Sequence, residues 1–169
     1  LDVDIESLRS DIRRANYVEP FDRHEEEVEN ASSSTYDGLG SPNWVRVGDY
    51  EWLLIYNGIK GGQGDFDPKD LVYRRVSYDE ANDSFSIGSR QILVEEGQSY
   101  FGLSSKTFPI IFPGSAVKLQ KGANSGRIIV TFSAVDSNRE YGALGLIYSD
   151  DNGYTWSTPQ DILRNVYPQ

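Results

Sequence analysis

Residues 149–156 read Ser-Asp-Asp-Asn-Gly-Tyr-Thr-Trp, and this stretch decides how the rest of the chain is interpreted. It suits a tight turn between two strands, because the Asp151 carboxylate can accept hydrogen bonds from backbone N–H groups of the turn. Gly153 can adopt a positive φ that a residue with a Cβ resists, and Trp156 can pack back onto the sheet. The fixed positions of the pattern S-x-D-x-G-x-T-W are Ser149, Asp151, Gly153, Thr155 and Trp156. The stretch therefore predicts a structural turn of a β-protein, not a catalytic site.

A calcium-binding loop is the alternative explanation for the acidic residues of this stretch. An EF-hand loop requires a Glu at its twelfth position, and the twelfth position counted from Asp151 is Ile162. The sequence has no Cys and only one His, His24, so no other metal-ligand cluster is suggested. We therefore expect neither a metal nor a cofactor.

A degenerate second copy of the turn begins at Ser77. Ser77-Tyr78-Asp79-Glu80 continues to Asn82, Ser84 and Phe85. This is the same pattern with one extra residue, and with Asn for Gly, Ser for Thr and Phe for Trp. The copies begin at positions 77 and 149, an interval longer than the roughly 40–50 residues of one propeller blade. Such repetition favours a β-propeller over a sandwich, with either a blade that lacks the turn or a long loop between the copies.

Short β-forming segments surround these turns and alternate with turn-forming residues such as Gly48-Asp49. The expected strands are 44–47, 50–56, 70–76, 84–87, 90–94, 116–119, 127–132 and 143–149. No helical period separates them, so the pattern predicts an all-β fold with antiparallel strands: a sandwich, a barrel or a propeller.

Residues 1–39 are predicted to form an N-terminal connector, partly helical or irregular, and residues 40–169 a partial β-propeller. Ile5, Leu8 and Ile12 follow a weak helical spacing, and a polar stretch that is typical of a linker comes after them. The chain begins with Leu and contains no Met, so we expect that its N-terminus was cut from a longer chain.

The composition limits the possible function classes. The net charge is −10 and the pI is near 4.5, which argues against a nucleic-acid binder because phosphate contacts need clustered Lys and Arg. An acidic sugar would need a local basic pocket in this field. No apolar run approaches the roughly 18 residues of a membrane span. The absence of Cys excludes disulfides and thiol catalysis.

Three further stretches carry a resemblance to a known family. They are 64–75 (Gly-Asp-Phe-Asp-Pro-Lys-Asp-Leu-Val-Tyr-Arg-Arg), 113–120 with the hairpin at 126–130 that follows it, and 147–148, which lead into the turn. Over about residues 40–160 the chain resembles bacterial-type sialidases (neuraminidases), in which such turns are called Asp boxes or BNR repeats. The resemblance implies antiparallel blades of a six-bladed sialidase-type β-propeller, of which this chain holds only two to three.

The resemblance also implies a function and a set of site residues. The function would be that of a hydrolase, an extracellular glycosidase that is secreted or on a virion surface and acts on sialylated glycans. Sialidases use a Tyr–Glu nucleophile pair, an Asp general acid/base and three Arg that bind the sialic acid carboxylate. By position Asp65 matches the acid/base, and the candidate substrate-binding residues are Arg74, Gly114, Ser115 and Trp44.

Each of these candidates also has a structural explanation. Asp65 can simply decorate a Gly-rich turn. Arg74 and Arg75 point to opposite sides of a strand, so at most one of them faces a pocket, and a structural ion pair is the alternative role. Trp44 can form a sugar-stacking platform with Trp52, Tyr56 and Tyr100, or all four aromatic residues can belong to the core.

The chain also departs from the family pattern. The first arginine of the family lies in an Arg-Ile-Pro sequence, where this chain has Gly40-Ser41-Pro42. The Tyr–Glu pair and the other two arginines belong to later blades, so the rest of the propeller is expected from a longer chain or a partner chain. Phage tailspike endosialidases, which lack parts of the usual catalytic set, are a similar variant. A non-catalytic glycan- or receptor-binding propeller is the alternative, followed by a purely structural piece of an assembly.

Overall fold

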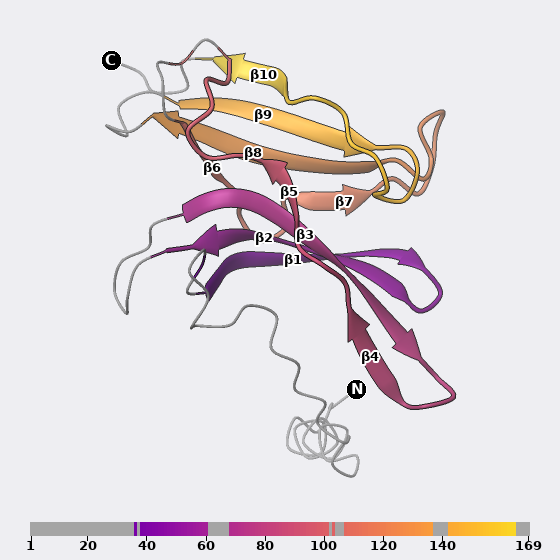
Figure 1. The fold of residues 1–169 in the computed structure, drawn as a ribbon. Helices are drawn as coiled ribbons and strands as arrows, with labels where there is room; N and C mark the ends of the chain where they lie inside the picture. Colours follow the sequence, from indigo (N-terminus) through magenta and orange to yellow (C-terminus); the bar gives the residue numbers. More distant parts are fainter. Residues whose placement is uncertain are drawn as a thin grey trace, which may run out of the picture.

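The computed structural model describes residues 36, 38–60, 68–101, 103, 107–136 and 142–164. In this part of the chain ten strands form two antiparallel sheets, with no helix, and neither sheet closes into a barrel (Figure 1). The prediction of an all-β, antiparallel fold is confirmed.

The first sheet is a meander of four positions. β1 (Gly38–Gly48), β2 (Glu51–Ile59) and β3 (Pro68–Asp79) follow one another, each antiparallel to its neighbour. β4 (Ser84–Ile87) and β5 (Gln91–Val94) then pair one after the other with the free edge of β3. The fourth position is therefore shared by two short strands.

The second sheet is also a meander of four positions, but its first position is the divided one. β6 (Thr107–Ile110) and β7 (Ala116–Lys118) both pair with β8 (Ile128–Asp136). β9 (Gly142–Ser149) pairs with β8, and β10 (Gln160–Arg164) completes the sheet. The Asp box at 149–156 thus joins the third and fourth positions, as the degenerate copy does in the first sheet.

All eight expected strands are present, and two further strands were missed. β6 reads Thr-Phe-Pro-Ile and β10 reads Gln-Asp-Ile-Leu-Arg. The proline of β6 and the polar start of β10 hide a strand signal that is already weak in five residues or fewer. β1 also begins earlier than expected, at Gly38. The expected helical spacing of Ile5, Leu8 and Ile12 lies outside the described residues.

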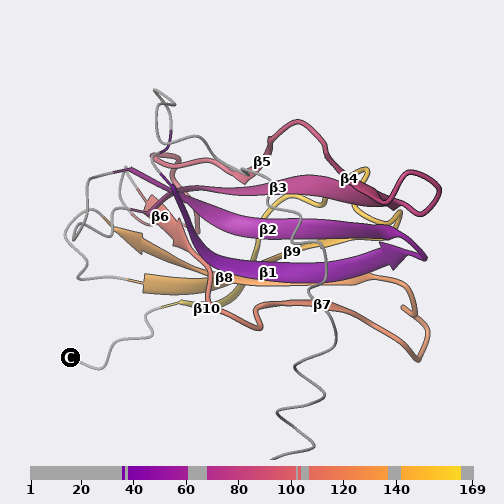
Figure 2. The ribbon, with the colours of Figure 1, turned by 90° about the horizontal axis from the view of Figure 1, so that it is seen from below.

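The two sheets pack face to face (Figures 1 and 2) and share one hydrophobic core. Alternate residues of β8 point into this core, as the pleat of a strand requires. Its fully buried members include Leu53, Ile55, Leu71, Ile111, Ile128, Val130, Phe132, Ala134 and Ile147. Because the core draws on both sheets, neither sheet buries this face alone.

The other face of the first sheet carries a second, smaller cluster. Its buried residues are Tyr36, Leu54, Tyr56, Val72 and Val76. The Tyr36 ring lies so close to Gly58 that a Cβ there would come within 2.6 Å of it. β2 is consequently buried on both faces, which explains its nearly continuous apolar sequence.

The turns of both sheets gather at one end of the structure, here called the turn end (Figure 1). It carries the β1–β2 turn, the β3–β4 turn, the β7–β8 turn and the Asp box. At the opposite end lie the strand ends Ile59, Pro68, Asp136 and Gly142. Among the described residues there is no helix long and apolar enough to cross a membrane.

Candidate functional site

The Asp box is a closed network of hydrogen bonds around Asp151. Its Oδ1 accepts from the Tyr154 N–H at 3.0 Å and from the Thr155 N–H at 2.8 Å, and its Oδ2 accepts from the Thr155 hydroxyl at 2.6 Å. Ser149 donates its hydroxyl to Asp151 at 2.8 Å and accepts from the Gly153 N–H at 2.8 Å. These bonds, led by the one from the Thr155 hydroxyl, lower the pKa of Asp151 to about 2.

The Asp box also docks onto the first sheet. Gly153 has a φ of +82°, and a Cβ there would come within 2.4 Å of the Leu53 side chain. The Trp156 ring packs on Tyr73 of β3 with 5.7 Å between centroids. The Trp156 indole N–H is buried and has no hydrogen-bond partner, so this side chain contributes through its apolar area. The turn therefore helps to hold the two sheets together.

Arg75 fixes the same turn from the side of the first sheet. Its Nη2 donates to the carbonyl of Asn152 at 2.9 Å, and its guanidinium lies 4.1 Å from the ring centroid of Tyr154. Its Nη1 forms an ion pair with Glu51 at 3.6 Å, which is too long for a hydrogen bond. Arg75 thus has the structural role that the sequence left open for one arginine of this pair.

A second arginine supports the Asp box within its own sheet. Arg127 binds both carboxylate oxygens of Asp150, at 2.7 and 2.8 Å, and stacks over the Tyr148 ring at 4.1 Å. The hydrogen bonds from Arg127 lower the pKa of Asp150. This bidentate pair ties the start of β8 to the end of β9.

The degenerate copy forms a simpler turn. Asp79 accepts hydrogen bonds from the Ala81 N–H at 3.0 Å and from the Asn82 side chain at 2.7 Å. Asp83, next to Asn82, takes the positive φ, +47°. Phe85, at the place of Trp156, is exposed and contacts Tyr78 at 5.0 Å between centroids. This turn caps its own strands but does not reach the other sheet.

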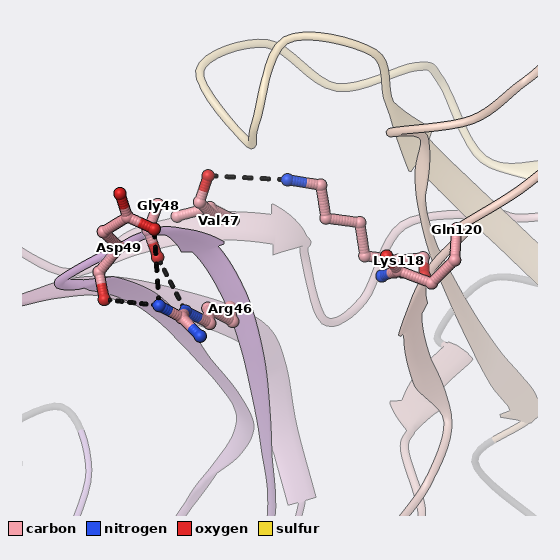
Figure 3. A pocket seen from close by; sticks show the side chains of 6 residues that line it. All are labelled: Arg46, Val47, Gly48, Asp49, Lys118 and Gln120. Atoms are coloured by element: carbon pink, nitrogen blue, oxygen red, sulfur yellow. Dashed lines mark hydrogen bonds and ion pairs between the residues drawn. The ribbon is translucent and has the colours of Figure 1, made fainter.

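A pocket of about 280 Å³ opens at the turn end, lined by Arg46, Val47, Gly48, Asp49, Lys118 and Gln120 (Figure 3). Lys118 donates to the Val47 carbonyl at 3.4 Å and to the Asn152 side chain at 2.9 Å. Arg46 donates to the carbonyls of Gly48 at 3.0 Å and Asp49 at 2.9 Å. Oxygen atoms of the chain thus already accept hydrogen bonds from both Lys118 and Arg46. We therefore interpret the pocket as a structural contact between β1 and β7.

The proposed substrate-binding residues lie in two separate places. Trp44 and Arg74 each pair with Leu54, so they stand in one cross-strand row on the outer face of the first sheet. Arg74 donates to the Tyr56 hydroxyl at 3.1 Å and to the Gly88 carbonyl at 3.0 Å. Trp44 remains 56% exposed. Its proposed stacking partners differ: Tyr56 is fully buried, and Tyr100 packs against the shared core.

Gly114 and Ser115 lie in the turn between β6 and β7. Gly114 has a φ of +85°, and its N–H donates to the Asn43 side chain at 2.8 Å. The Ser115 hydroxyl accepts from the Phe112 N–H at 3.2 Å. Asn43 pairs with Ile55 of the shared core, so this turn contacts β1 from the face opposite to Trp44. The structure therefore does not bring the four residues together.

Asp65 lies outside the described residues. The strands that flank it, β2 and β3, have their nearest ends at Ile59 and Pro68. These two strand ends lie opposite the turn end. Among the described residues, no three His, Asp or Glu side chains are grouped so that they could hold a metal ion.

Two buried asparagines were missed by the sequence reasoning. Asn57 donates to the Pro109 carbonyl at 2.7 Å and accepts from the Ile111 N–H at 2.9 Å. Asn43 donates to the Phe112 carbonyl at 3.1 Å as well as accepting from Gly114. Asn57 continues the inward-facing positions of Leu53 and Ile55. A polar residue at an inward-facing position of an apolar strand is a sequence signal for a buried side chain that forms hydrogen bonds.

The sequence matches no protein-family model and no curated protein.

Proposed function

We propose that the chain forms two neighbouring blades of an Asp-box β-propeller, in a sialidase- or endosialidase-like glycoside hydrolase that acts on sialylated glycans. The observation that supports this most is the place of the two related turns. Each lies between the third and fourth positions of a four-position antiparallel meander. A supersecondary unit that repeats with the same turn at the same place is typical of a propeller.

The outer face of the second sheet gives separate support. Apolar side chains of β8 and β9 stand there in cross-strand pairs, such as Ile129 with Tyr148. Leu144 and Leu146 belong to the same face, and these four side chains are only partly buried. Val117 of β7 extends the face and is 51% exposed. Apolar faces of this kind are usually covered, and a further blade, from a longer chain or a partner chain, would cover this one.

The proposed chemistry rests on Asp65. As general acid it would protonate the glycosidic oxygen of the leaving group, and as general base it would then activate water against the covalent intermediate. The nucleophile pair and the arginines that bind the carboxylate would come from blades beyond this chain. In the sequence, Asp65 comes between the end of β2 and the start of β3.

Hydrolysis of a fluorogenic α-linked sialoside by the full polypeptide that carries this chain tests the proposal. Asp65→Ala is expected to lower kcat roughly 100-fold or more, because general acid catalysis is lost. Asp67→Ala, a carboxylate removed from the same stretch, is the matched control and is expected to keep its rate. An unchanged rate for Asp65→Ala would remove the acid/base assignment. No hydrolysis by the wild-type protein would contradict the glycosidase function itself.

A non-catalytic glycan- or receptor-binding propeller is the second candidate. Two observations on arginine favour it. β1 carries Gly40-Ser41-Pro42 where the resemblance expects Arg-Ile-Pro, and the Arg74 guanidinium is bound by Tyr56 and Gly88. This function predicts saturable binding of a sialylated glycan without product. A glycan array without a single binding signal would contradict it.

A further inference from the structure

Two cations from different sheets line the pocket at the turn end. Lys118 comes from β7 of the second sheet, and Arg46 comes from β1 of the first sheet (Figure 3). Lys118 binds the carbonyl of Val47. Arg46 binds the carbonyl of the next residue, Gly48. Both cations therefore lie along the same short stretch of β1.

The positive charge of Lys118 is not balanced by a carboxylate within the described part of the chain. Its ammonium group donates to the Val47 carbonyl at 3.4 Å and to the Asn152 side-chain oxygen at 2.9 Å. Both acceptors are uncharged, and among the described residues no carboxylate forms an ion pair with Lys118. The side chain is partly buried in a protein of net charge −10. A partly buried cation of this kind suits a site for an anionic ligand.

The contact between β1 and β7 does not use every hydrogen-bond donor of these two cations. A lysine ammonium group has three N–H donors, and an arginine guanidinium has five. Lys118 bonds to two oxygens. Arg46 donates through Nε and Nη2 to Gly48 and Asp49. Within the described residues, the Nη1 group of Arg46 and one N–H of Lys118 thus remain available to a ligand.

The rim of the pocket carries acceptors that suit hydroxyl groups. The Asp49 side chain is 96% exposed, and its ion pair with Arg46 is long, at 3.4 Å. A carboxylate has about four acceptor sites, so Asp49 can accept hydrogen bonds from hydroxyls of a ligand. Gln120 donates its Nε2 to the Lys118 carbonyl at 3.2 Å, and its Oε1 is a further acceptor. The pocket therefore suits a ligand that has one carboxylate and several hydroxyls.

The size and the lining of the pocket limit the class of ligand further. Its volume of about 280 Å³ is near the lower end of the range for small-molecule sites, about 300–1,000 Å³, which suits a single sugar unit. No aromatic ring is among the described residues that line it, so a sugar would bind through charge and hydrogen bonds without stacking. Binding should therefore be weak and should decrease as the salt concentration rises.

We propose that this pocket binds an acidic sugar. The Nζ of Lys118 and the Nη1 of Arg46 donate to the sugar carboxylate, and the sugar hydroxyls donate to Asp49. A protein of net charge −10 needs such a local basic pocket to hold an anion. The inference rests on the proposed function for the choice of a sugar, but it involves no hydrolysis. The pocket also shares no residue with the candidate catalytic and substrate-binding residues of that function.

NMR titration of the full chain with N-acetylneuraminic acid tests this pocket. The backbone amide signals of Gly48, Lys118 and Gln120 should shift and saturate. The methyl ester of the same sugar lacks the negative charge, and it should bind about tenfold more weakly because the charge-assisted hydrogen bonds are lost. D-Glucuronate is a second acidic sugar. Binding of either acid supports the proposal, and the tighter of the two identifies the sugar.

Lys118→Gln should weaken the binding of the acid about tenfold. Lys121→Gln, which removes the same charge from the exposed turn between β7 and β8, is the matched control and should leave binding unchanged. Because Lys118 also connects β1 to β7, Asp49→Asn provides a variant that keeps this contact. It should tighten binding about threefold, since it removes a like charge from the rim and keeps an acceptor.

Several results would overturn the proposal: no binding of either acid, equal binding of the methyl ester, or displacement of the sugar by acetate at the same concentration. Equal losses in Lys118→Gln and Lys121→Gln, or weaker binding in Asp49→Asn, would also contradict it. The hydrolysis assay gives a separate result. Binding at the pocket without hydrolysis would remove the glycosidase function and keep the pocket, whereas hydrolysis without binding at the pocket would remove only the pocket.

Discussion

The two Asp turns show how single residues decide what a shared motif does. In the Asp box, one carboxylate accepts from two backbone N–H groups and two hydroxyls. In the degenerate copy, Asn82 replaces Gly and Phe85 replaces Trp, and Asp79 binds only residues of its own turn. The intact motif couples a turn to a neighbouring sheet because Gly153 and Trp156 allow close contact. The degenerate motif has neither this glycine nor this tryptophan.

Asp151→Asn tests the charge at the centre of the Asp box. The pKa of Asp151 in the folded protein, about 2, lies below its ordinary value of 3.8. The ionised form therefore stabilises the fold fully above pH 4 or so, and this stabilisation is lost as the pH falls toward 2. Thermal unfolding should show a lower Tm for Asp151→Asn at pH 7, by roughly 5 °C, and a gap that narrows below about pH 4. A gap that stays constant down to pH 3 would contradict this.

Gly153→Ala and Gly126→Ala separate backbone strain from crowding. Both glycines have positive φ, +82° and +91°, but a Cβ at Gly126 meets no atom within 4 Å. Gly126→Ala should cost about 1 kcal/mol, the strain of a left-handed backbone. Gly153→Ala should cost about 3 kcal/mol, because its Cβ also displaces Leu53. Denaturant unfolding measures both values, and equal costs would mean that Leu53 moves aside freely.

At the scale of elements, polar side chains connect two short strands of the second sheet, β6 and β7, to the first sheet. Asn57 of β2 bonds to both sides of the end of β6, and Asn43 of β1 bonds to the turn before β7. Short strands have few ladder bonds of their own: β6 pairs with β8 through four residues and β7 through three. The asparagines therefore supply contacts that the ladder cannot supply.

Asn57→Leu tests this clamp. The change keeps the side-chain size but leaves the Pro109 carbonyl and the Ile111 N–H buried without partners. The expected loss is about 3 kcal/mol in the free energy of unfolding, from two unsatisfied groups. Asn124→Leu, on the exposed turn before β8, is the matched control and should change stability by less than about 0.5 kcal/mol. Similar losses for both variants would show that the clamp is not the cause.

At the scale of the whole molecule, the two sheets have unequal surroundings. Both faces of the first sheet carry buried clusters. Among the described residues, the second sheet has a buried cluster on the face that meets the first sheet, whereas Ile129, Leu144, Leu146 and Tyr148 form a partly exposed row on its outer face. Such an arrangement suits a unit that packs against a further element on the outer face of its second sheet.

Leu146→Lys tests that inference. If the outer face of the second sheet is a contact surface, the isolated chain should self-associate as its concentration rises, because apolar area is removed from water. Sedimentation should then give an average mass above 19.0 kDa for the wild type and a monomer for Leu146→Lys. Ser86→Lys, an exposed position on the first sheet, should behave like the wild type. A wild-type chain that stays monomeric at every concentration would contradict the prediction.

The sequence by itself determined the features that arise from near neighbours. The bonds of Asp151 reach at most four residues along the chain, and alternation within a strand depends on adjacent residues. The all-β class, the eight longer or clearer strands and the two turns were therefore predictable. β6 and β10 were not, because their short sequences become strands only when they pair with β8 and β9.

Only the tertiary structure decided which of these elements meet. The bonds from Asn57 to Pro109 and from Asn43 to Gly114 join residues that are 52 and 71 positions apart. The tertiary structure also decided the partners of the two adjacent arginines. Arg75 binds the Asp box of the other sheet, whereas Arg74 binds Tyr56 of its own sheet. Within a strand, the side chains of two adjacent residues point to opposite faces of the sheet. Which face is covered, and by what, depends on the packing of the two sheets, and no local pattern carries that information.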